Sequence, residues 1–210
     1  LGELPKVADE VFLAGFPIGG EEVSLTKGII SRYDVFSLED NVQSQLLSCQ
    51  VDAAGNPGNS GGPAIAPADG SVLGIVWGGL LFGNNITYIV PAPIIKHFLK
   101  GANSDQYLGF PQLKLNVQFL ENPVLRNYYQ LPEEKSGVLF KSIDQLNSPF
   151  QLGDIILEIN GYLLANDGTI NYQGLRLSAG HLISEKFLNE QIEVKVWRSG
   201  AEVTLQVPIT

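Results

Sequence analysis

The chain consists of many short apolar runs interrupted by glycine and proline. Its 210 residues include 23 glycines and 12 prolines. This pattern favours β-structure over a helical bundle. In the first half, apolar runs bounded by Gly, Asp or Asn predict strands at residues 11–16, 23–31, 46–52, 72–77 and 86–90. Short strands at this spacing predict a sandwich or a barrel in a mainly β protein.

A helix and then a linker are expected after these strands. Pro91-Ala92-Pro93 opens the helix, and Ile94, Ile95, Phe98 and Leu99 would form one apolar stripe along it. The small and polar segment 101–106 then predicts a linker. We therefore expect two domains, at residues 1–100 and 107–210.

The second half mixes strands and helices. Asn122 suits a helix N-cap and Pro123 suits the first helical position, which predicts a short helix. Alternating apolar residues on both sides of Ser199-Gly200 predict a hairpin over 192–209. Further strands are expected at 113–120, 137–143 and 154–164, and a second helix at 175–188.

Composition excludes several classes of partner. The net charge of −9 disfavours nucleic acid and anionic membranes. No run of 18 apolar residues exists, so no integral membrane segment is expected. Cys49 is the only cysteine, which rules out an intramolecular disulfide, and we expect it in the core. No metal site or cofactor is predicted. The chain starts at Leu1 and contains no Met, so we interpret it as a fragment.

The segment from Asp52 to Pro63 carries the strongest chemical signal. Ser60 lies between Gly58-Asn59 and Gly61-Gly62, with an apolar strand before the loop and another after it. Glycine at position 58 would let the amides of Gly58 and Ser60 point to one spot. Two such amides beside a serine hydroxyl form an oxyanion hole, and loss of one donor costs about 3–4 kcal/mol of barrier.

This loop resembles the nucleophile loop of the Deg/HtrA proteases in the chymotrypsin clan. Residues 120–126, 166–169 and 183–186 resemble the plant-type Deg branch most. Other segments agree with the family in order and spacing: 16–20, 26–31, 88–91, 153–156 and 160–161. The resemblance implies the C-terminal β-barrel of a trypsin-like protease domain followed by a PDZ-like α+β domain.

The resemblance also implies that two catalytic residues are missing from this chain. A serine nucleophile needs a base, usually histidine, that a carboxylate orients. In the family both come from the first barrel, upstream of every segment matched here. The chain has only His97 and His181, and we expect both to be ordinary helix residues. By itself the chain should therefore have little or no peptidase activity.

Three residues are predicted to shape the substrate pocket. In the chymotrypsin clan, the residue six positions before the nucleophile lies at the base of the substrate pocket, where an acid selects Lys or Arg. The resemblance therefore implies that Ala54 takes this position. Val76 and Trp77 would form an apolar pocket wall and a strand edge for the substrate. We expect cleavage after small or medium aliphatic residues.

A carboxylate-binding loop is expected in the second domain, with two possible registers. Residues 107–110 match the family loop by composition, whereas spacing to the following helix places it at Leu113, Lys114 and Leu115. We favour the second register because Pro111 cannot donate an amide. Lys114 then stands where the family usually has glycine, so a role in regulation or oligomer contact remains an alternative.

The function that the resemblance implies is an ATP-independent serine endopeptidase of protein quality control. Its partners would be unfolded or damaged polypeptides and peptide C-termini, and the full protein would be a trimer-based homo-oligomer. The resemblance leaves the compartment open between an organelle such as the chloroplast and the bacterial periplasm. The alternative is a non-catalytic peptide-binding module with a vestigial serine. An esterase nucleophile elbow is disfavoured because residues 63–67, which contain two prolines, cannot carry a long helix.

Overall fold

A computed structural model describes residues 1–18, 20–37, 45–79, 86–104, 109–111, 113, 115–143 and 148–209. The chain divides into two compact units. The first comprises Leu1–Phe36 and Leu46–Tyr107, and the second contains Leu108–Thr210. Each unit is described by itself.

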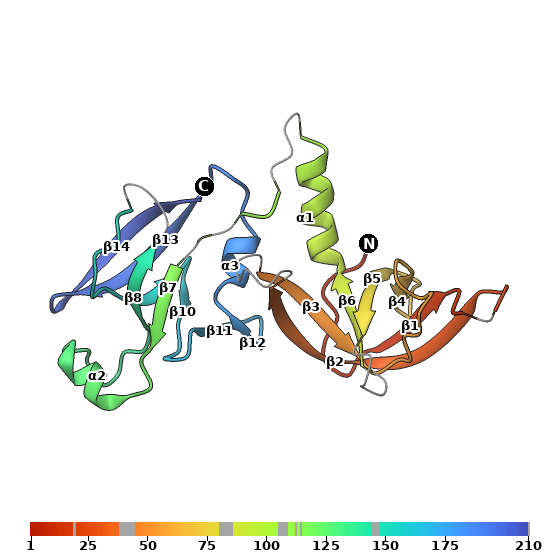
Figure 1. Ribbon diagram of the computed structural model, residues 1–210, viewed down its shortest axis with the longest axis horizontal. Coiled ribbons are helices and arrows are strands. Elements are labelled where there is room, and N and C mark those ends of the chain that lie inside the picture. Colours follow the sequence, from red (N-terminus) through yellow and green to blue (C-terminus); the bar gives the residue numbers. More distant parts are fainter. Residues whose placement is uncertain are drawn as a thin grey trace. The chain divides into compact units, whose positions relative to one another are not determined.

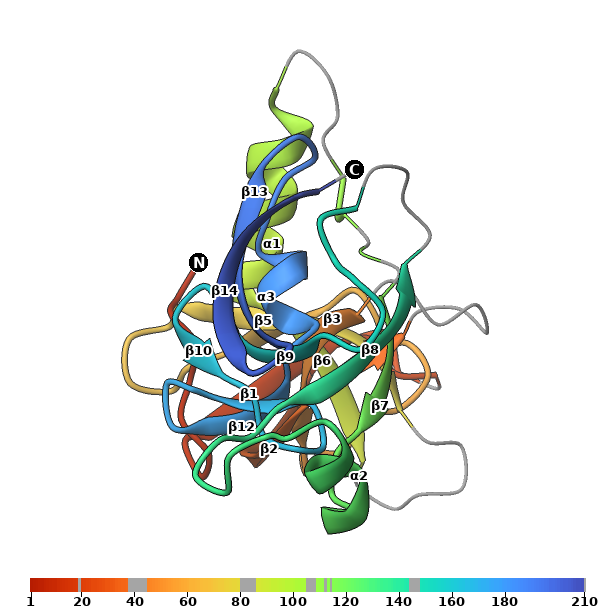
Figure 2. The same cartoon turned by 90° about the vertical axis from the view of Figure 1, so that its left-hand side faces the viewer.

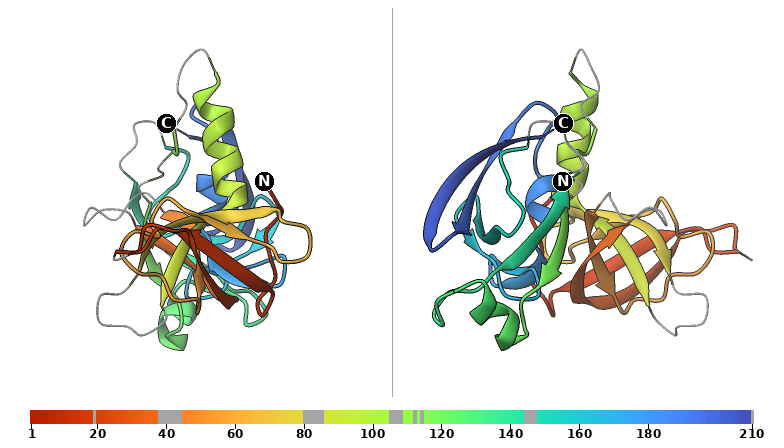
Figure 3. Two further views of the ribbon diagram at one scale, coloured as in Figure 1. Left: turned by 90° about the vertical axis from the view of Figure 1, so that its right-hand side faces the viewer. Right: turned by 60° about the vertical axis from the view of Figure 1, so that its left-hand side comes forward.

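The first unit is a closed barrel with the strand order β1-β2-β3-β6-β5-β4 (Figure 1). Every second residue of β1 points inward, and Val11 and Leu13 are buried in the core. Figure 3 shows how strongly β2 curves around this core. The strands are β1 (Glu10–Gly15), β2 (Ser24–Ser37), β3 (Gln45–Val51), β4 (Pro63–Ile65), β5 (Val72–Gly79) and β6 (Thr87–Pro91).

The prediction of a mainly β fold with a barrel is confirmed. Strand β2 runs to Ser37, beyond the predicted end at residue 31. Strand β4 was not predicted, because it has only three residues, begins with Pro63 and shows no alternation of polar and apolar residues. It nevertheless pairs with both β1 and β5 and closes the barrel.

Helix α1 (Ala92–Ala102) continues directly from β6. A proline at its start suits the first turn, where no backbone donor is needed. The helix contacts β5 and β6, and Ile94 is buried. Phe98 and Leu99 are about half exposed, so the predicted apolar stripe is buried only in part.

The second unit contains a six-stranded sheet with the order β14-β13-β9-β8-β7, in which β10 pairs with β9 (Figure 2). Strands β11 and β12 form a separate hairpin. The elements are β7 (Leu115–Phe119), α2 (Pro123–Tyr128), β8 (Val138–Ile143), β9 (Ile155–Ile159), β10 (Tyr162–Leu163), β11 (Thr169–Tyr172), β12 (Leu175–Ser178), α3 (His181–Ser184), β13 (Gln191–Arg198) and β14 (Ala201–Pro208).

In the second unit, turns made by an αL residue followed by glycine form tight hairpins. Ser199 and Gly200 have φ of 50° and 91° and join β13 to β14, as predicted. Asn160 and Gly161 have φ of 49° and 84°. They split the predicted strand 154–164 into the β9–β10 hairpin.

The predicted helix at 175–188 is wrong. The segment contains strand β12 and the single-turn helix α3, with Gly180 between them. Leu175 and Leu177 pair with β11, and Leu177 is buried. Cross-strand pairing therefore overrides a pattern of apolar spacing that also suits a helix.

Arg126 joins three segments of the second unit. Its Nη1 donates to Asn166 Oδ1 at 2.7 Å, and its Nη2 donates to the Lys135 carbonyl at 2.7 Å. Asn166 Oδ1 also accepts from the Gly137 amide at 3.1 Å. Arg126 Nη2 lies within reach of two more carbonyls, those of Pro132 and Glu133. A planar guanidinium has enough fixed donors for this arrangement, and a lysine does not.

Replacement of Arg126 by lysine should therefore destabilise the second unit. We expect Arg126→Lys to lower its free energy of unfolding by about 1.5–3 kcal/mol. Urea unfolding followed by Trp197 fluorescence in a Trp77→Phe background measures this unit. Arg176→Lys is the matched control, because the Arg176 side chain is 74% exposed and such ion pairs contribute less than about 1 kcal/mol. Equal effects of the two substitutions would contradict this role of Arg126.

His181 is a buried ionisable residue in the second unit. It is 2% exposed, and its ring packs edge-on against Tyr172 with centroids 4.6 Å apart. Neither ring nitrogen has a hydrogen-bond partner among the described residues. Burial lowers the pKa of His181 below its usual 6.5, and the Glu185 carboxylate 3.7 Å from Nε2 opposes this shift only in part.

The lowered pKa predicts a loss of stability in acid. Below pH 6.5 the unfolded chain takes up a proton on His181 that the folded chain excludes. The free energy of unfolding should therefore be highest above pH 6.5 and fall as the pH approaches the lowered folded-state pKa. Urea unfolding at pH 7.5 and 5.5 measures this. His181→Phe keeps the ring contact with Tyr172, and its stability should fall less between these pH values than that of the wild type.

Candidate functional site

Ser60 lies on an exposed loop that joins the end of β3 to β4. Its Oγ makes no hydrogen bond with any residue in the described part of the chain. The hydroxyl is therefore accessible, and its reactivity depends on the groups brought to it.

A β-turn from Asn56 to Asn59 precedes the serine. The Asn59 amide donates to the Asn56 carbonyl at 3.0 Å and closes the turn. Proline at the second position and glycine with a φ of 104° at the third define a type II turn. Only glycine fits here, because a Cβ on Gly58 would lie 2.1 Å from the Phe16 carbonyl oxygen.

The turn directs the Gly58 amide away from the hairpin formed by β1 and β2. In a trans peptide the C=O and N–H groups point in opposite directions. The Pro57 carbonyl accepts from the Ile18 amide at 3.0 Å, so the Gly58 N–H of the same peptide points the other way. Likewise, the Asn59 carbonyl accepts from the Gly62 amide at 3.0 Å, which turns the Ser60 N–H away from Gly62. Neither the Gly58 nor the Ser60 N–H donates to any residue that the structure describes.

The segment that follows β1 and the strand β5 hold the loop from opposite ends. The Phe16 amide donates to the Gly58 carbonyl at 3.2 Å, next to the Ile18 contact. After the serine, the Gly61 amide donates to the Val76 carbonyl at 2.7 Å, and the Val76 amide donates to the Gly62 carbonyl at 2.9 Å. The backbone around Ser60 is therefore fixed by the segment that follows β1 on one side and by β5 on the other.

Asn59 supports the loop from within the barrel. It is 2% exposed, and its Nδ2 donates to the Ala54 carbonyl at 3.4 Å. The residue that the sequence placed in the oxyanion loop thus points its side chain toward the segment that carries Ala54. Ala54 itself is half-buried.

Val76 and Trp77 occupy different environments. Val76 is 3% exposed inside the barrel, and its backbone pairs with the loop after Ser60. The Trp77 indole is 42% exposed, packs against Phe36 and Tyr88, and donates from Nε1 to Ser48 Oγ at 3.0 Å. The structure therefore brings Val76 to the serine loop through its backbone and holds the Trp77 ring in an aromatic cluster.

The other ionisable candidates lie on other elements of the chain. His97 lies on α1, and His181 lies in the core of the second unit. Burial raises the pKa of the Cys49 thiol to about 12, so it stays protonated and is a poor nucleophile. In the described part of the chain, no group of three His, Cys, Asp or Glu residues could hold a metal ion. No described helix is long and apolar enough to cross a membrane.

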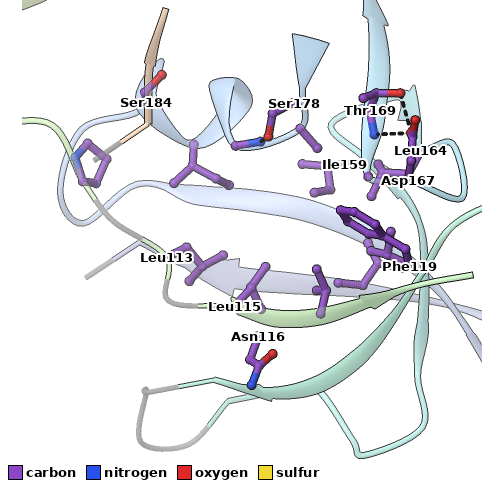
Figure 4. A pocket seen from close by; sticks show the side chains of 18 residues that line it. Leu113, Leu115, Asn116, Phe119, Ile159, Leu164, Asp167, Thr169, Ser178 and Ser184 are labelled. Carbon is purple, nitrogen blue, oxygen red and sulfur yellow. Dashed lines mark hydrogen bonds between the residues drawn. The ribbon is translucent and has the colours of Figure 1, made fainter. Parts of the chain in front are cut away.

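A groove of about 620 Å³ lies between β7 and α3 in the second unit (Figure 4). Leu113 and Leu115 project into it from one side, and the segment from Ser178 to Ser184 forms the other. Lys114, the middle residue of the predicted carboxylate-binding loop, lies outside the described residues. Strand β7 is at the edge of its sheet.

Comparison with known proteins agrees with this geometry. The family model of the trypsin-like peptidase domain matches residues 2–75. The chain is 38% identical to Protease Do-like 4, mitochondrial, from Arabidopsis thaliana over 207 residues, which are 96% of this chain and 39% of that protein. It is 35% identical to the Arabidopsis Protease Do-like 2, chloroplastic, over 99% of this chain and 35% of that protein. The chain thus spans less than two fifths of the length of these relatives.

Solved structures share the fold. The HtrA-type protease AlgW with a tripeptide superposes with a TM-score of 0.68 and 22% identity, covering 97% of this chain and 65% of that one. The sequence relatives, the peptidase-domain match and the barrel that presents Ser60 lead to one conclusion. The chain contains part of a trypsin-like peptidase domain and is homologous to the Deg/HtrA serine proteases.

Proposed function

We propose that this chain carries the nucleophile of a serine endopeptidase, with Ser60 as the attacking residue. The observation that carries the proposal is the pair of unused amides, Gly58 N–H and Ser60 N–H, beside an exposed serine hydroxyl. Such donors stabilise the oxyanion of a tetrahedral intermediate without reorganising during the reaction.

The reaction follows from these groups. A base takes the Ser60 hydroxyl proton as Oγ attacks the carbonyl carbon of the peptide bond, and the two amides hold the oxygen that gains negative charge. Collapse of the intermediate breaks the C–N bond, and the base returns its proton to the leaving amine. Water then attacks the carbonyl carbon of the acyl-enzyme while the base takes a proton from the water. The base returns this proton to Ser60 Oγ as the bond between Oγ and the acyl group breaks.

In this proposal, a part of the protein outside these 210 residues supplies the general base and the carboxylate that orients it. Ser60 Oγ has no hydrogen-bond partner in the described part of the chain. His181 is buried in the second unit and is in contact with Tyr172 and Glu185. The relatives are more than twice as long as the matched region, which leaves room for a further domain in the whole protein.

The pocket is proposed to accept small or medium aliphatic side chains before the cleaved bond. Ala54 brings no carboxylate to the pocket base, so selection of Lys or Arg has no chemical support. Val76 fixes the strand next to the loop, and a substrate backbone can pair along this edge. Trp77 remains a predicted wall residue. Its hydrogen bond to Ser48 would hold the indole in place.

The second unit is proposed to be a PDZ-like domain that binds peptides, including peptide C-termini. The predicted linker would join it to the barrel. The groove between β7 and α3 supports this role, because an extended peptide could pair with the edge strand β7 while its side chains enter the groove. Leu113, Lys114 and Leu115 immediately precede or begin that strand and would receive the terminal carboxylate.

Homology to the Deg/HtrA proteases further supports a role in ATP-independent protein quality control. The substrates proposed for the whole protein are unfolded or damaged polypeptides, and its proposed assembly is a trimer-based homo-oligomer. Light scattering coupled to size-exclusion chromatography measures that assembly directly.

A fluorophosphonate probe tests the nucleophile and the missing base together. We expect it to label the natural, longer form of the protein at Ser60 and to fail with Ser60→Ala. The 210-residue chain alone should react at least about a thousandfold more slowly, because loss of triad members costs several orders of magnitude. Gel fluorescence and mass spectrometry of the labelled peptide measure this. Fast labelling of the short chain would contradict an external base and make His97 the candidate.

The type II turn gives a second test. Gly58→Ala should reduce labelling of the longer protein by at least about a hundredfold, because the new Cβ collides with the Phe16 carbonyl and turns the amide from its position. Gly70→Ala is the matched control in the same barrel. Gly70 also has a positive φ, of 73°, but a Cβ there meets no atom within 4 Å. Equal labelling of the two variants at equal folded fraction would contradict the role assigned to Gly58.

A further inference from the structure

Two consecutive carbonyls at the predicted pocket base accept hydrogen bonds from threonine hydroxyls. Thr87 Oγ1 on β6 donates to the Ala53 carbonyl at 2.8 Å. Thr26 Oγ1 on β2 donates to the Ala54 carbonyl at 2.9 Å. The segment 53–54 is therefore held by two threonines from different strands, and these threonines are 61 positions apart in the sequence.

The contact with Thr87 leaves no space beneath the segment. Thr87 is 1% exposed, and a Cβ on Gly55 would lie 2.3 Å from Thr87 Oγ1 and 2.6 Å from its Cγ2. Backbone and threonine side chain are thus in direct contact. The bulk of Thr87 sets how far the segment carrying Ala54 can sink into the barrel.

The same carbonyl connects the pocket base to the nucleophile loop. Besides Thr26, the Ala54 carbonyl accepts from Asn59 Nδ2 at 3.4 Å. Asn59 directly precedes Ser60 and is buried. A shift of the Ala54 carbonyl would therefore move the side chain of Asn59, the residue next to the nucleophile. We call Thr26, Ala53, Ala54, Asn59 and Thr87 the pocket-base network.

We infer that Thr26 and Thr87 are positioning residues that set the depth of the substrate pocket and, through Asn59, the placement of Ser60 over it. This inference rests on the proposed peptidase function.

Kinetics on the natural, longer protein test the positioning role. The measured quantity is the ratio of kcat/KM for two peptides that differ only in Leu or Ala before the cleaved bond. Partial misfolding lowers both rates equally and leaves this ratio unchanged, whereas a moved pocket base changes it. Thr87→Ala removes bulk below Gly55 and should raise the Leu-to-Ala ratio about tenfold.

The hydroxyl groups are tested by paired substitutions. Thr26→Val keeps the shape and removes the donor, and it should change the ratio at least about threefold. Thr26→Ser and Thr87→Ser keep the donors and should stay closer to the wild-type ratio than the donor-free variants. Tyr33→Phe is the control, because it removes another buried hydroxyl of the barrel, bonded to the Pro5 carbonyl, outside the network. An unchanged ratio in both Thr26→Val and Thr87→Ala would overturn the inference.

A second measurement works without peptidase activity. In the 210-residue chain, NMR should show that Thr26→Val shifts the carbonyl carbon of Ala54 and the amide of Ser60, whereas Tyr33→Phe shifts neither. Shifts confined to the surroundings of residue 26 would overturn the network. An inactive longer protein with the expected shifts would instead refute the proposed function and leave the network supported.

Discussion

The backbone around Ser60 depends on one close contact, between Gly58 and the Phe16 carbonyl. A side chain at position 58 would collide with that oxygen at 2.1 Å, so the turn exists only with glycine there. The Ile18 and Phe16 amides bind the carbonyls on one side of this turn. The amide of Gly58 is left facing the other way as a consequence of peptide planarity. The oxyanion donors are thus fixed by the segment that follows strand β1 before any substrate arrives.

Most of the barrel could be predicted from sequence because its strands are short apolar runs bounded by Gly, Asp or Asn. Val11 and Leu13 point inward with the expected period of two. Prediction failed where local pattern and tertiary pairing disagree. Strand β4 is three residues long and gains its structure only from β1 and β5. The apolar residues of segment 175–188 have the spacing of a helix, yet Leu175 and Leu177 pair with strand β11 instead.

The residues of the nucleophile loop could be predicted from the sequence, but the residues that hold this loop and the pocket base in place could not. The sequence identified Ser60 and Gly58 because glycines around a serine form a local signal. Thr26 and Thr87 had no such signal, since their partners Ala54 and Ala53 lie 28 and 34 positions away. Asn59 was placed in the right loop, but its side chain points inward to Ala54.

Motifs that resemble one branch of a family need not all concern catalysis. The segments around Arg126 and Asn166 resemble the plant-type branch, whereas the serine loop resembles the Deg/HtrA proteases in general. In the structure they meet each other, and the Arg126 guanidinium donates hydrogen bonds to Asn166 and to the carbonyls of Pro132, Glu133 and Lys135, all within the second unit. The serine loop differs in a way that the hydrogen bonds make plain. Arg126 and Asn166 use their polar groups on each other, whereas the loop leaves a hydroxyl and two amides without a partner in the described chain. Unused polar groups on a rigid backbone are what a reacting carbonyl needs, so they are the better guide to function.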